Sequence, residues 1–290
     1  MPNAEEQQYL ELVKRCIEKG ARRNDRTKTG TCALFGASMR FSLENGKLPL
    51  LTTKSVAFRA VLEELLFFIR AQTDNKLLKE KKINIWTGNS TKEFFEMNDI
   101  QREEDDLGPI YGFQWRHYGA NYYTCNDSYK GQGIDQLQNV IDTLKTDPTS
   151  RRMLVVAWNP SQLKEMALPP CHCLFQFLSD GENLTCILYQ RSADMGLGVP
   201  FNICSYSLLT IMVAKVAGLK PYEFIHFIGD AHVYSNHVDS LKMQIEREPR
   251  DFPSLRLAEK EYKNIEDFRF EDFILENYNP HEKIAMKMAV

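Results

Sequence analysis

The sequence has no apolar run long enough to cross a membrane. A membrane-spanning helix needs about 18 consecutive apolar residues, and two serines, a threonine and a lysine interrupt the most apolar stretch, residues 203–219. The first ten residues are polar and acidic, which is not typical of a secretory signal. We therefore expect no membrane anchor and no secretory leader.

An excess of charge of one sign is also missing. The 290 residues contain 36 lysines and arginines against 39 aspartates and glutamates, which leaves a net charge of -3. Proteins that bind along nucleic acids usually carry a strongly basic surface, so we expect no DNA partner. A few converging arginines can still bind the phosphate of a small molecule, because guanidinium groups match phosphate oxygens.

Cysteines are few, odd in number and scattered, which does not indicate a disulfide framework. The pattern suits a reducing compartment, and we expect a cytoplasmic protein that could also reside in the nucleus. A zinc site at Cys171-His172-Cys173 is not favoured, because a strand would turn residue 172 away and no second ligand group has suitable spacing. We expect no metal. The seven cysteines are residues 16, 32, 125, 171, 173, 186 and 204.

Repeats, low-complexity tracts and flexible linkers are absent from the sequence, and predicted strands and helices are mixed along it. We therefore expect one α+β domain over residues 1–290. Residues 87–133 are polar and turn-rich around an apolar island, 111–115, and the chain is irregular from residue 277 onward. The hydrophobic pattern predicts helices at 5–20, 56–71, 133–144 and 202–217, and strands at 32–43, 153–158, 173–179, 184–192, 225–234 and 252–257.

Cys171 is the first candidate for chemistry, in the run LPPCHC at 168–173. Two prolines remove backbone donors and stiffen the chain directly before the cysteine. A thiol held at the mouth of a strand is suited to act as a nucleophile. Three other interpretations remain open at this point. Cys171 could be an ordinary core cysteine, the run could bind zinc, and His172 could be a hydrogen-bonded core or turn histidine.

Polar residues crowd the end of the predicted strand 184–192. They are Gln190, Arg191, Ser192 and, shortly after, Asp194. Polar groups at the end of a buried strand are either satisfied within the protein or directed at a ligand. A simple polar cap and turn would explain the serine and the aspartate, but it does not easily explain the arginine beside them.

The next helix is predicted to begin at Pro200, because proline suits the first helical position. Asn202 would then lie in the first turn of that helix. Gly196 and Gly198 precede it and allow a close approach of the backbone to a ligand. The segment therefore predicts a ligand-binding loop between a strand and a helix.

Three further features are candidates for binding or catalysis. Glu64 is a carboxylate inside the apolar helix 56–71, and burying an unpaired carboxylate is costly. Basic residues cluster at 22–28 and 151–152, where they are either a solvated surface or phosphate ligands. Asp230, His232 and Tyr234 share one side of a predicted strand, where His232 and Tyr234 could hydrogen-bond a sugar hydroxyl.

Taken together, these segments resemble the folate-dependent thymidylate synthases over nearly the whole chain. The extra length between His117 and Gln136 resembles the insertions of the eukaryotic-type branch. The segments that carry the resemblance are Asp25-Arg26-Thr27, LPLLTTK (48–54), LEELLFF (62–68), LGPIYGFQWRH (107–117), RRMLVVAWNP (151–160), MALPPCHC (166–173), YQRSADMGLGVPFNI (189–203), IGDAHVYSNH (228–237) and the terminal KMAV.

The resemblance implies reductive methylation of dUMP to dTMP, with 5,10-methylenetetrahydrofolate donating carbon and hydride and leaving as dihydrofolate. Cys171 is expected to add to C6 of uracil, activated by Arg191. Glu64 would transfer protons through water, and Tyr111 would assist removal of the proton from C5. Asn202 would read the base. A carboxamide offers one donor and one acceptor and so pairs with uracil, whereas a carboxylate would favour cytosine.

The resemblance also implies a homodimer with shared active sites. Arg26, Arg191 and Ser192 would bind the nucleotide phosphate, joined by Arg151 and Arg152 of the second copy. We expect a large, twisted, mixed β-sheet with helices on one face, and with the other face forming the dimer interface. Further contacts to dUMP are expected from Cys171, His172, Gln190, Asp194, Asn202, His232 and Tyr234.

The folate is expected to bind against an apolar wall, and the end of the chain would close over it and exclude water. Four positions depart from the family pattern, and they raise questions about kinetics and folate-analogue affinity rather than about the reaction. These departures are Lys28, Thr87, Ala193 and Cys204. The expected folate-binding residues are Ile85, Trp86, Asn89, Asp194, Leu197, Gly198, Phe201, Met288 and Ala289.

Two alternative functions remain at this level. A deoxypyrimidine nucleotide hydroxymethylase on the same scaffold would let water trap the methylene intermediate. A catalytically silent nucleotide- or RNA-binding relative would be expected to lack Cys171 or a phosphate arginine, and neither is missing.

Overall fold

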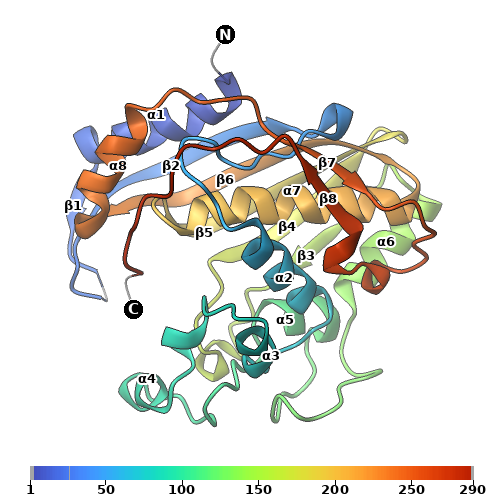
Figure 1. The fold of residues 1–290 in the computed structure, drawn as a ribbon. Coiled ribbons are helices and arrows are strands. Elements are labelled where there is room, and N and C mark those ends of the chain that lie inside the picture. The colour runs from blue at the N-terminus through green and yellow to red at the C-terminus, as the bar shows by residue number, and fades with distance from the viewer. Residues whose placement is uncertain (1–2, 26, 289–290) are drawn as a thin grey trace.

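The computed structural model describes residues 3–25 and 27–288. These residues form a single α+β domain built on a six-stranded mixed sheet (Figure 1). The strand order across the sheet is β1-β2-β6-β5-β4-β3. The strands are β1 (Ala21–Arg23), β2 (Thr31–Ser42), β3 (Leu154–Val156), β4 (His172–Ser179), β5 (Asn183–Asp194) and β6 (Lys220–Tyr234).

The central pair, β5 and β6, is the parallel pair of this sheet, and the other neighbours are antiparallel. Parallel neighbours need a long crossover connection, and helix α7 (Gly198–Ala217) provides it. The crossover brings the end of β5 and the start of α7 together beside the end of β6. The polar residues in the last part of β5 therefore lie where the two central strands end.

Helices cover one face of the sheet and form the core with it. α1 packs on β2 and β6, α7 packs on β5 and β6, and α2 packs on α7. By length and composition α7 could cross a membrane, yet 83% of its most apolar window is buried inside the domain, as in the core helix of a globular fold. The helices are α1 (Ala4–Lys19), α2 (Phe58–Ile69), α3 (Lys76–Glu80), α4 (Lys92–Met97), α5 (Tyr111–His117), α6 (Gln136–Thr146), α7 and α8 (Val238–Ile245).

The opposite face of the sheet carries large apolar side chains that no helix of residues 3–25 and 27–288 covers. Tyr189 of β5 and Phe227 of β6 are direct cross-strand partners, and they are 43% and 45% exposed. Leu154 of β3 is exposed as well. Isolated exposed apolar residues are ordinary, but neighbouring ones in the middle of a sheet mark an interaction surface.

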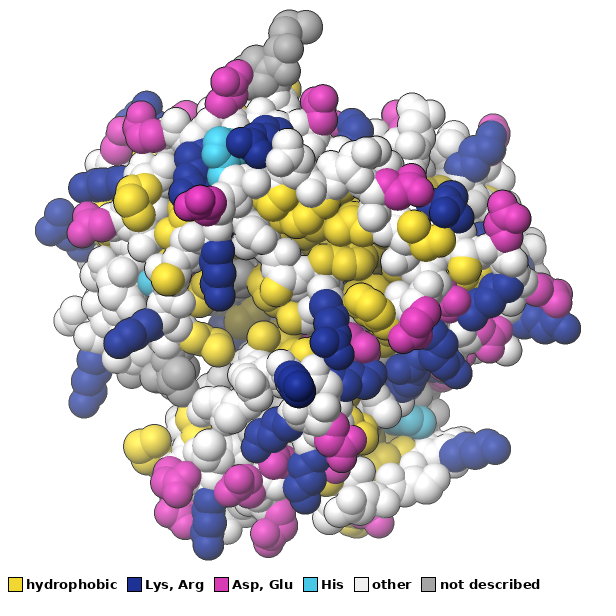
Figure 2. All heavy atoms as spheres, in the orientation of Figure 1, with side chains coloured by type: hydrophobic (Ala, Val, Ile, Leu, Met, Phe, Trp, Pro, Cys, Tyr) yellow, Lys and Arg dark blue, Asp and Glu magenta, His cyan; other side chains and the backbone are white. Residues whose placement is uncertain are grey.

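The face with α7 shows a hollow in its surface. In Figure 2 a band of apolar side chains crosses the middle of this face beside a shaded hollow, and charged side chains gather around it. Figure 2 has the orientation of Figure 1, and the hollow seen there lies below the level of α7.

Most of the predicted elements are present, but β6 begins at Lys220 instead of residue 225, β1, β8 (Phe273–Glu276) and α3 were not predicted, and further differences follow. α7 begins at Gly198, so Pro200 is its third residue and Asn202 lies beyond the first turn. The predicted strand 252–257 is β7 (Ser254–Leu257), which pairs with β8 in a separate two-stranded sheet. The turn-rich segment 87–133 contains the short helices α4 and α5, and α8 was not predicted.

Candidate active site

Cys171 lies directly before β4 and is partly exposed. Its backbone N–H donates to the Tyr111 hydroxyl at 2.8 Å, and its carbonyl accepts from the N–H of Arg191 at 2.9 Å. The two bonds attach the cysteine to α5 on one side and to β5 on the other. The backbone that carries the thiol is therefore held in place, as the proline pair before it suggested.

The Arg191 guanidinium lies beside this thiol. Its Nη2 is 4.0 Å from Sγ of Cys171. Nε and Nη2 also donate to the carbonyls of Pro170 and Pro169, at 2.9 and 3.0 Å, and the group stacks over the Trp158 ring at 5.2 Å. The prolines thus supply acceptors that aim the cation. A fixed positive charge at this distance favours the thiolate over the thiol.

Glu64 is partly buried on α2 and accepts a hydrogen bond from Nε1 of Trp86 at 2.8 Å. Burial raises the pKa of Glu64 to about 7, although the hydrogen bond from Trp86 acts in the opposite direction. A carboxyl group with a pKa near neutrality can both release and accept a proton under working conditions.

Aromatic rings connect Glu64 to Cys171. Tyr111 packs against Phe68 at 5.0 Å, Trp86 at 6.2 Å and His172 at 5.1 Å between ring centroids. Burial raises the pKa of Tyr111 well above its usual value, so the hydroxyl stays protonated. Burial also lowers the pKa of His172 to about 4, which keeps the imidazole neutral at pH 7.

Asn202 is buried on α7 and faces the end of β5. Its Oδ1 accepts a hydrogen bond from Nε2 of Gln190 at 3.0 Å. A β-carbon added at Gly198 would lie 3.6 Å from this same oxygen and from Cβ of Asp194. The strand end, the glycine loop and the helix therefore converge at one place.

Asp194 holds the glycine loop. Its carboxylate accepts from the backbone N–H groups of Gly196 and Leu197 at 2.8 and 3.3 Å. Burial opposes ionisation, but hydrogen bonding to His237 and to the loop outweighs it and lowers the pKa of Asp194. The carboxylate is thus charged at neutral pH.

The end of β6 carries the predicted ribose contacts. His232 Nδ1 lies 3.0 Å from Oδ1 of Asp230, and the His232 and Tyr234 rings are 5.1 Å apart. Arg23 of β1 pairs with the other oxygen of Asp230 at 2.6 Å. The aspartate therefore holds the histidine, while the arginine holds the aspartate.

One of the other predicted phosphate ligands, Ser192, lies opposite Asp230 across the β5–β6 pair. Ser192 is on β5 next to Arg191, whereas Arg151 and Arg152 are exposed before β3. Within residues 3–25 and 27–288, neither arginine side chain has a hydrogen bond or ion pair. Arg26 lies outside the described residues.

The predicted folate residues include Trp86 of the ring cluster and Asp194 and Leu197 of the glycine loop. Trp86 and Asn89 are buried, and Phe201, Leu197 and Ile85 are partly buried. Met288 is 46% exposed at the end of the described chain, and Ala289 lies outside it.

The chain end runs back to this site. The backbone N–H of His281 donates to the carbonyl of Thr52 at 2.6 Å, and Nε2 of His237 lies 2.6 Å from the carbonyl oxygen of Lys287. A β-carbon at Gly196 would meet both His237 and the sulfur of Met286. The tail therefore packs directly on the glycine loop.

The comparisons with known proteins agree with this geometry. The thymidylate synthase family model matches residues 7–290. The chain is 58% identical over 290 residues to thymidylate synthase 1/2 of Encephalitozoon cuniculi, covering 99% of this chain and 98% of that protein. It is 54% identical to the thymidylate synthases of Saccharomyces cerevisiae (99% and 98% covered) and Homo sapiens (98% and 91% covered).

The chain belongs to the thymidylate synthase family. The family resemblance inferred from the sequence segments is confirmed. No metal site is expected from the sequence. Within the described part of the chain, no group of three or more His, Cys, Asp or Glu side chains could hold a metal ion. No disulfide joins any of the seven cysteines, all of which are described.

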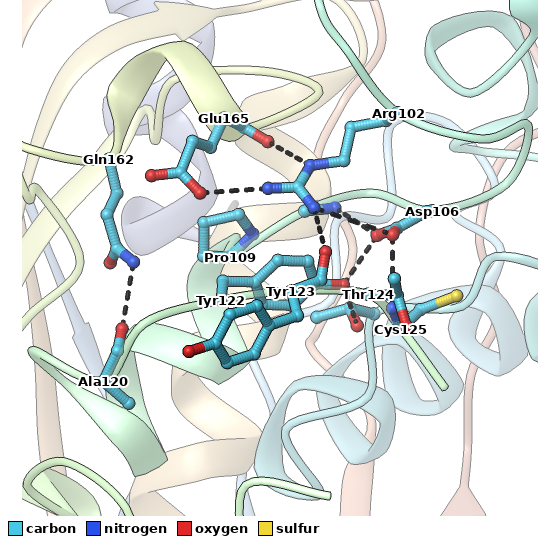
Figure 3. Close-up of polar contacts among 12 residues, drawn as sticks. Arg102, Asp106, Pro109, Ala120, Tyr122, Tyr123, Thr124, Cys125, Gln162 and Glu165 are labelled. Atoms are coloured by element: carbon cyan, nitrogen blue, oxygen red, sulfur yellow. Dashed lines mark hydrogen bonds and ion pairs between the residues drawn. The ribbon is translucent and has the colours of Figure 1, made fainter. Parts of the chain in front are cut away.

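A polar network braces the segment that contains Gln162 and Glu165, which precedes Cys171 in the chain (Figure 3). Arg102 donates to the carboxylate and the backbone carbonyl of Glu165, at 3.0 and 3.2 Å. It also stacks on Tyr122 at 4.5 Å, whose hydroxyl donates to Asp106 at 2.6 Å. Gln162 donates to the carbonyl of Ala120 at 3.0 Å. The extra length after His117 is therefore fastened to this segment before Cys171.

The four departures from the family pattern lie in different surroundings. Lys28 has a φ of 60°, in the left-handed region that favours the glycine expected there. Ala193 and Cys204 are fully buried, and burial raises the pKa of the Cys204 thiol, which therefore stays protonated. Thr87 begins a short 3-10 helix next to Trp86.

Two residues of the site were missed at the sequence level. Trp158 supports the Arg191 guanidinium, and its signal was its position in the quoted segment RRMLVVAWNP. His226 lies behind Gln190, with its Nε2 2.8 Å from Oε1 of that residue. Its signal was a histidine inside an apolar strand, FIHFI.

Proposed function

We propose that this protein is a thymidylate synthase that converts dUMP to dTMP, with 5,10-methylenetetrahydrofolate supplying the carbon and the hydride and leaving as dihydrofolate. The observation that carries the proposal is the Arg191 guanidinium 4.0 Å from the partly exposed Cys171 thiol, with Asn202 at the adjoining loop. Full-length similarity to proteins named thymidylate synthase supports the same reaction and does not favour a hydroxymethylase or a silent relative.

Cys171 is the nucleophile in this proposal. Its thiolate forms a bond from Sγ to C6 of the uracil ring, and the electron pair displaced from the C5–C6 double bond makes C5 nucleophilic. Arg191 stabilises the thiolate before the attack. Held by two carbonyls and the Trp158 ring, the guanidinium needs little reorganisation to do so.

Asn202 selects the base. Its carboxamide offers an acceptor to N3–H of uracil and a donor to the carbonyl at C4. Cytosine presents an acceptor and an amino donor at these positions, so the same carboxamide orientation is mismatched to it. The active site therefore takes dUMP in preference to dCMP.

Glu64 and Tyr111 manage protons. Glu64, with a pKa of about 7, delivers and removes protons at the base through water. Tyr111 remains protonated, and its hydroxyl accepts the N–H of Cys171, which places it beside the reacting ring. From there it assists the removal of the proton from C5.

The rest of the nucleotide is bound by the strand ends. Arg26, Arg191 and Ser192 hold the phosphate, and His232 and Tyr234 hold the ribose hydroxyl. His172, Gln190 and Asp194 line the pocket. The ion pair between Arg23 and Asp230 and the contact of Asp230 with His232 support the ribose assignment, because they fix the imidazole orientation.

The folate binds against the apolar and amide side chains around the glycine loop. The last residues close over it and keep water out. The tail contact at His237 supports this role because it already joins the chain end to the loop. The proposed folate residues are Ile85, Trp86, Asn89, Asp194, Leu197, Gly198, Phe201, Met288 and Ala289.

The enzyme works as a homodimer in which each chain is one catalytic domain over residues 1–290. The uncovered sheet face with Tyr189 and Phe227 is the interface, since a second copy would bury these exposed apolar side chains. Arg151 and Arg152 of each copy then complete the phosphate site of the other. We place the dimer in the cytoplasm, with the nucleus as a second compartment, and expect no membrane or DNA partner.

The deciding experiment is spectrophotometric. Purified protein with 5,10-methylenetetrahydrofolate should produce dihydrofolate only when dUMP is added, and the nucleotide product should have the mass of dTMP. Consumption of the folate without dihydrofolate, together with a hydroxymethylated nucleotide, would instead establish the hydroxymethylase reaction.

A further inference from the structure

A fully buried histidine lies behind Gln190, which contacts the residue that reads the base. His226 of β6 has 0% of its surface exposed. Its Nε2 is 2.8 Å from Oε1 of Gln190, and its ring packs against Phe224 at 5.5 Å. Its Nδ1 has no hydrogen-bond partner within the described residues. Burying a polar atom without a hydrogen-bond partner costs free energy, so the one polar contact that the His226 ring makes calls for an explanation.

The contacts of Gln190 fix which way its amide points. Nε2 of Gln190 donates to the backbone carbonyl of Ser192 at 2.9 Å and to Oδ1 of Asn202 at 3.0 Å. A backbone carbonyl can only accept, so the amide nitrogen must face it. Both N–H groups of Gln190 are then used, and its Oε1 is left as an acceptor that needs a donor.

His226 supplies that donor. Burial lowers the pKa of His226 to about 3, so the ring is neutral and carries one proton. Because Oε1 of Gln190 can only accept, that proton must be on Nε2. Nδ1 then carries a lone pair and no hydrogen.

The chain of bonds ends at the base-reading side chain. Oδ1 of Asn202 accepts from Gln190, so the Asn202 oxygen is fixed on the Gln190 side and its Nδ2 points the other way. If the Gln190 amide turned by 180°, its oxygen would face Asn202 and would favour the opposite orientation of the Asn202 carboxamide. That orientation reverses the donor and acceptor order that the nucleotide meets.

We propose that His226 is a positioning residue that, together with the Ser192 carbonyl, holds Gln190 in the direction that orients the Asn202 carboxamide, and thereby supports the preference for uracil over cytosine. The inference rests on the proposed function, because it concerns the nucleotide that the active site selects. His226 itself does not touch the nucleotide in this assignment.

The test compares two substitutions at one position by titration calorimetry with dUMP and dCMP. His226→Met fills the position with an unbranched apolar side chain that has no hydrogen-bond donor. The ratio of the dCMP to the dUMP dissociation constant should therefore fall about tenfold. His226→Gln can donate again from its amide and should restore the ratio to within about threefold of wild type. An unchanged ratio in folded His226→Met protein overturns the proposal.

Phe224→Leu is the matched control, since Phe224 is also fully buried, lies two residues earlier on β6 and packs on the His226 ring. It should lower the melting temperature and leave the nucleotide ratio unchanged. A ratio that falls equally in this control shows a general packing effect and counts against the proposal.

A measurement on the wild-type protein covers the case in which His226→Met does not fold. Nitrogen chemical shifts of labelled histidine should show His226 as the neutral Nε2–H tautomer from pH 5 to 8. The Nδ1–H tautomer, or a charged ring, refutes the proposal. If the wild-type protein forms no dihydrofolate with dUMP, the proposed function fails. The tautomer measurement does not depend on turnover, so the two failures can be told apart.

Discussion

At the scale of single residues, the proposed chemistry depends on one sulfur atom. Cys171→Ala should lower turnover by more than about a thousandfold, because no other group in the site can form the bond to C6. The variant should still bind dUMP, since Arg191 remains held by the carbonyls of Pro169 and Pro170. Dihydrofolate formation and calorimetric dUMP binding are the two measurements. Near wild-type turnover would contradict the covalent step.

Glu64 gives a pH dependence with a definite sign. Burial raises its pKa from 4.5 to about 7 in the folded protein, so the folded state binds the proton more tightly than the unfolded chain. The free-energy cost of burying the ionised Glu64 carboxylate is therefore absent below pH 4.5. It grows between pH 4.5 and 7 and is complete above pH 7. Glu64→Gln should stabilise the protein by about 2 kcal/mol at pH 8 and by much less at pH 5.

Urea unfolding at the two pH values measures this difference, and dihydrofolate formation should fall sharply in the same variant. Glu63→Gln is the neighbouring control. Glu63 pairs with Lys81 at 2.5 Å, so its loss should not stabilise the protein at pH 8. Equal stability changes for Glu64→Gln at both pH values would contradict a raised pKa.

The chemically unusual residues of the site could be read from the sequence, and their supports could not. Glu64 and Cys171 stand out because a carboxylate in an apolar helix and a thiol after two prolines are uncommon. Trp158 and His226 do not stand out, because their roles depend on side chains more than 30 residues away in the chain. Periodicity reports which face a residue occupies, not which distant group it meets.

At the scale of elements, the crossing of α2 and α5 depends on a glycine. A β-carbon at Gly112 of α5 would lie 2.3 Å from the backbone oxygen of Phe68 in α2. Gly112→Ala should therefore push the two helices apart and destabilise the domain by about 2–3 kcal/mol, as overpacking does in other cores. The neighbouring residue, Tyr111, would move with α5, so activity should also fall.

Thermal and urea unfolding measure the effect. Gly198→Ala is a suitable stability control, because a β-carbon there would make only ordinary contacts, the nearest at 3.6 Å. It should change stability by less than about 1 kcal/mol. If both variants have the same stability, the close approach of α5 to α2 does not restrict residue 112 to glycine.

Long elements were predictable because their hydrophobic pattern is long. α1, α2 and β5 appear where the spacing of apolar residues placed them. The start of α7 was placed too late because Pro200 was taken as its first residue, whereas a proline is also tolerated within the first turn, where N–H groups have no helical partner. The short helices α4 and α5 have too few turns to produce a periodic signal.

At the scale of the whole molecule, the helices of the described residues cover one face of the sheet and leave the other uncovered. The pairing of exposed Tyr189 with exposed Phe227 is a property of the strand order, which brings β5 and β6 together through the α7 crossover. The family resemblance predicts an uncovered sheet face, but it identifies neither Tyr189 nor Phe227 as part of that face. Arg151 and Arg152 lack partners within the described chain, which fits residues that act on a second copy.

Mixing two inactive chains tests whether sites are shared. One chain carries Cys171→Ala, and the other carries Arg151→Ala with Arg152→Ala. In a mixed dimer, the intact Cys171 of the second chain lies in a site with the intact arginines of the first chain. One of the two active sites of the mixed dimer is therefore complete. With random exchange half of the dimers are mixed, and activity should recover to about a quarter of wild type. Activity that stays at the sum of the two separate variants after complete subunit exchange would contradict arginines donated across the interface, because each site would then be built from one chain alone.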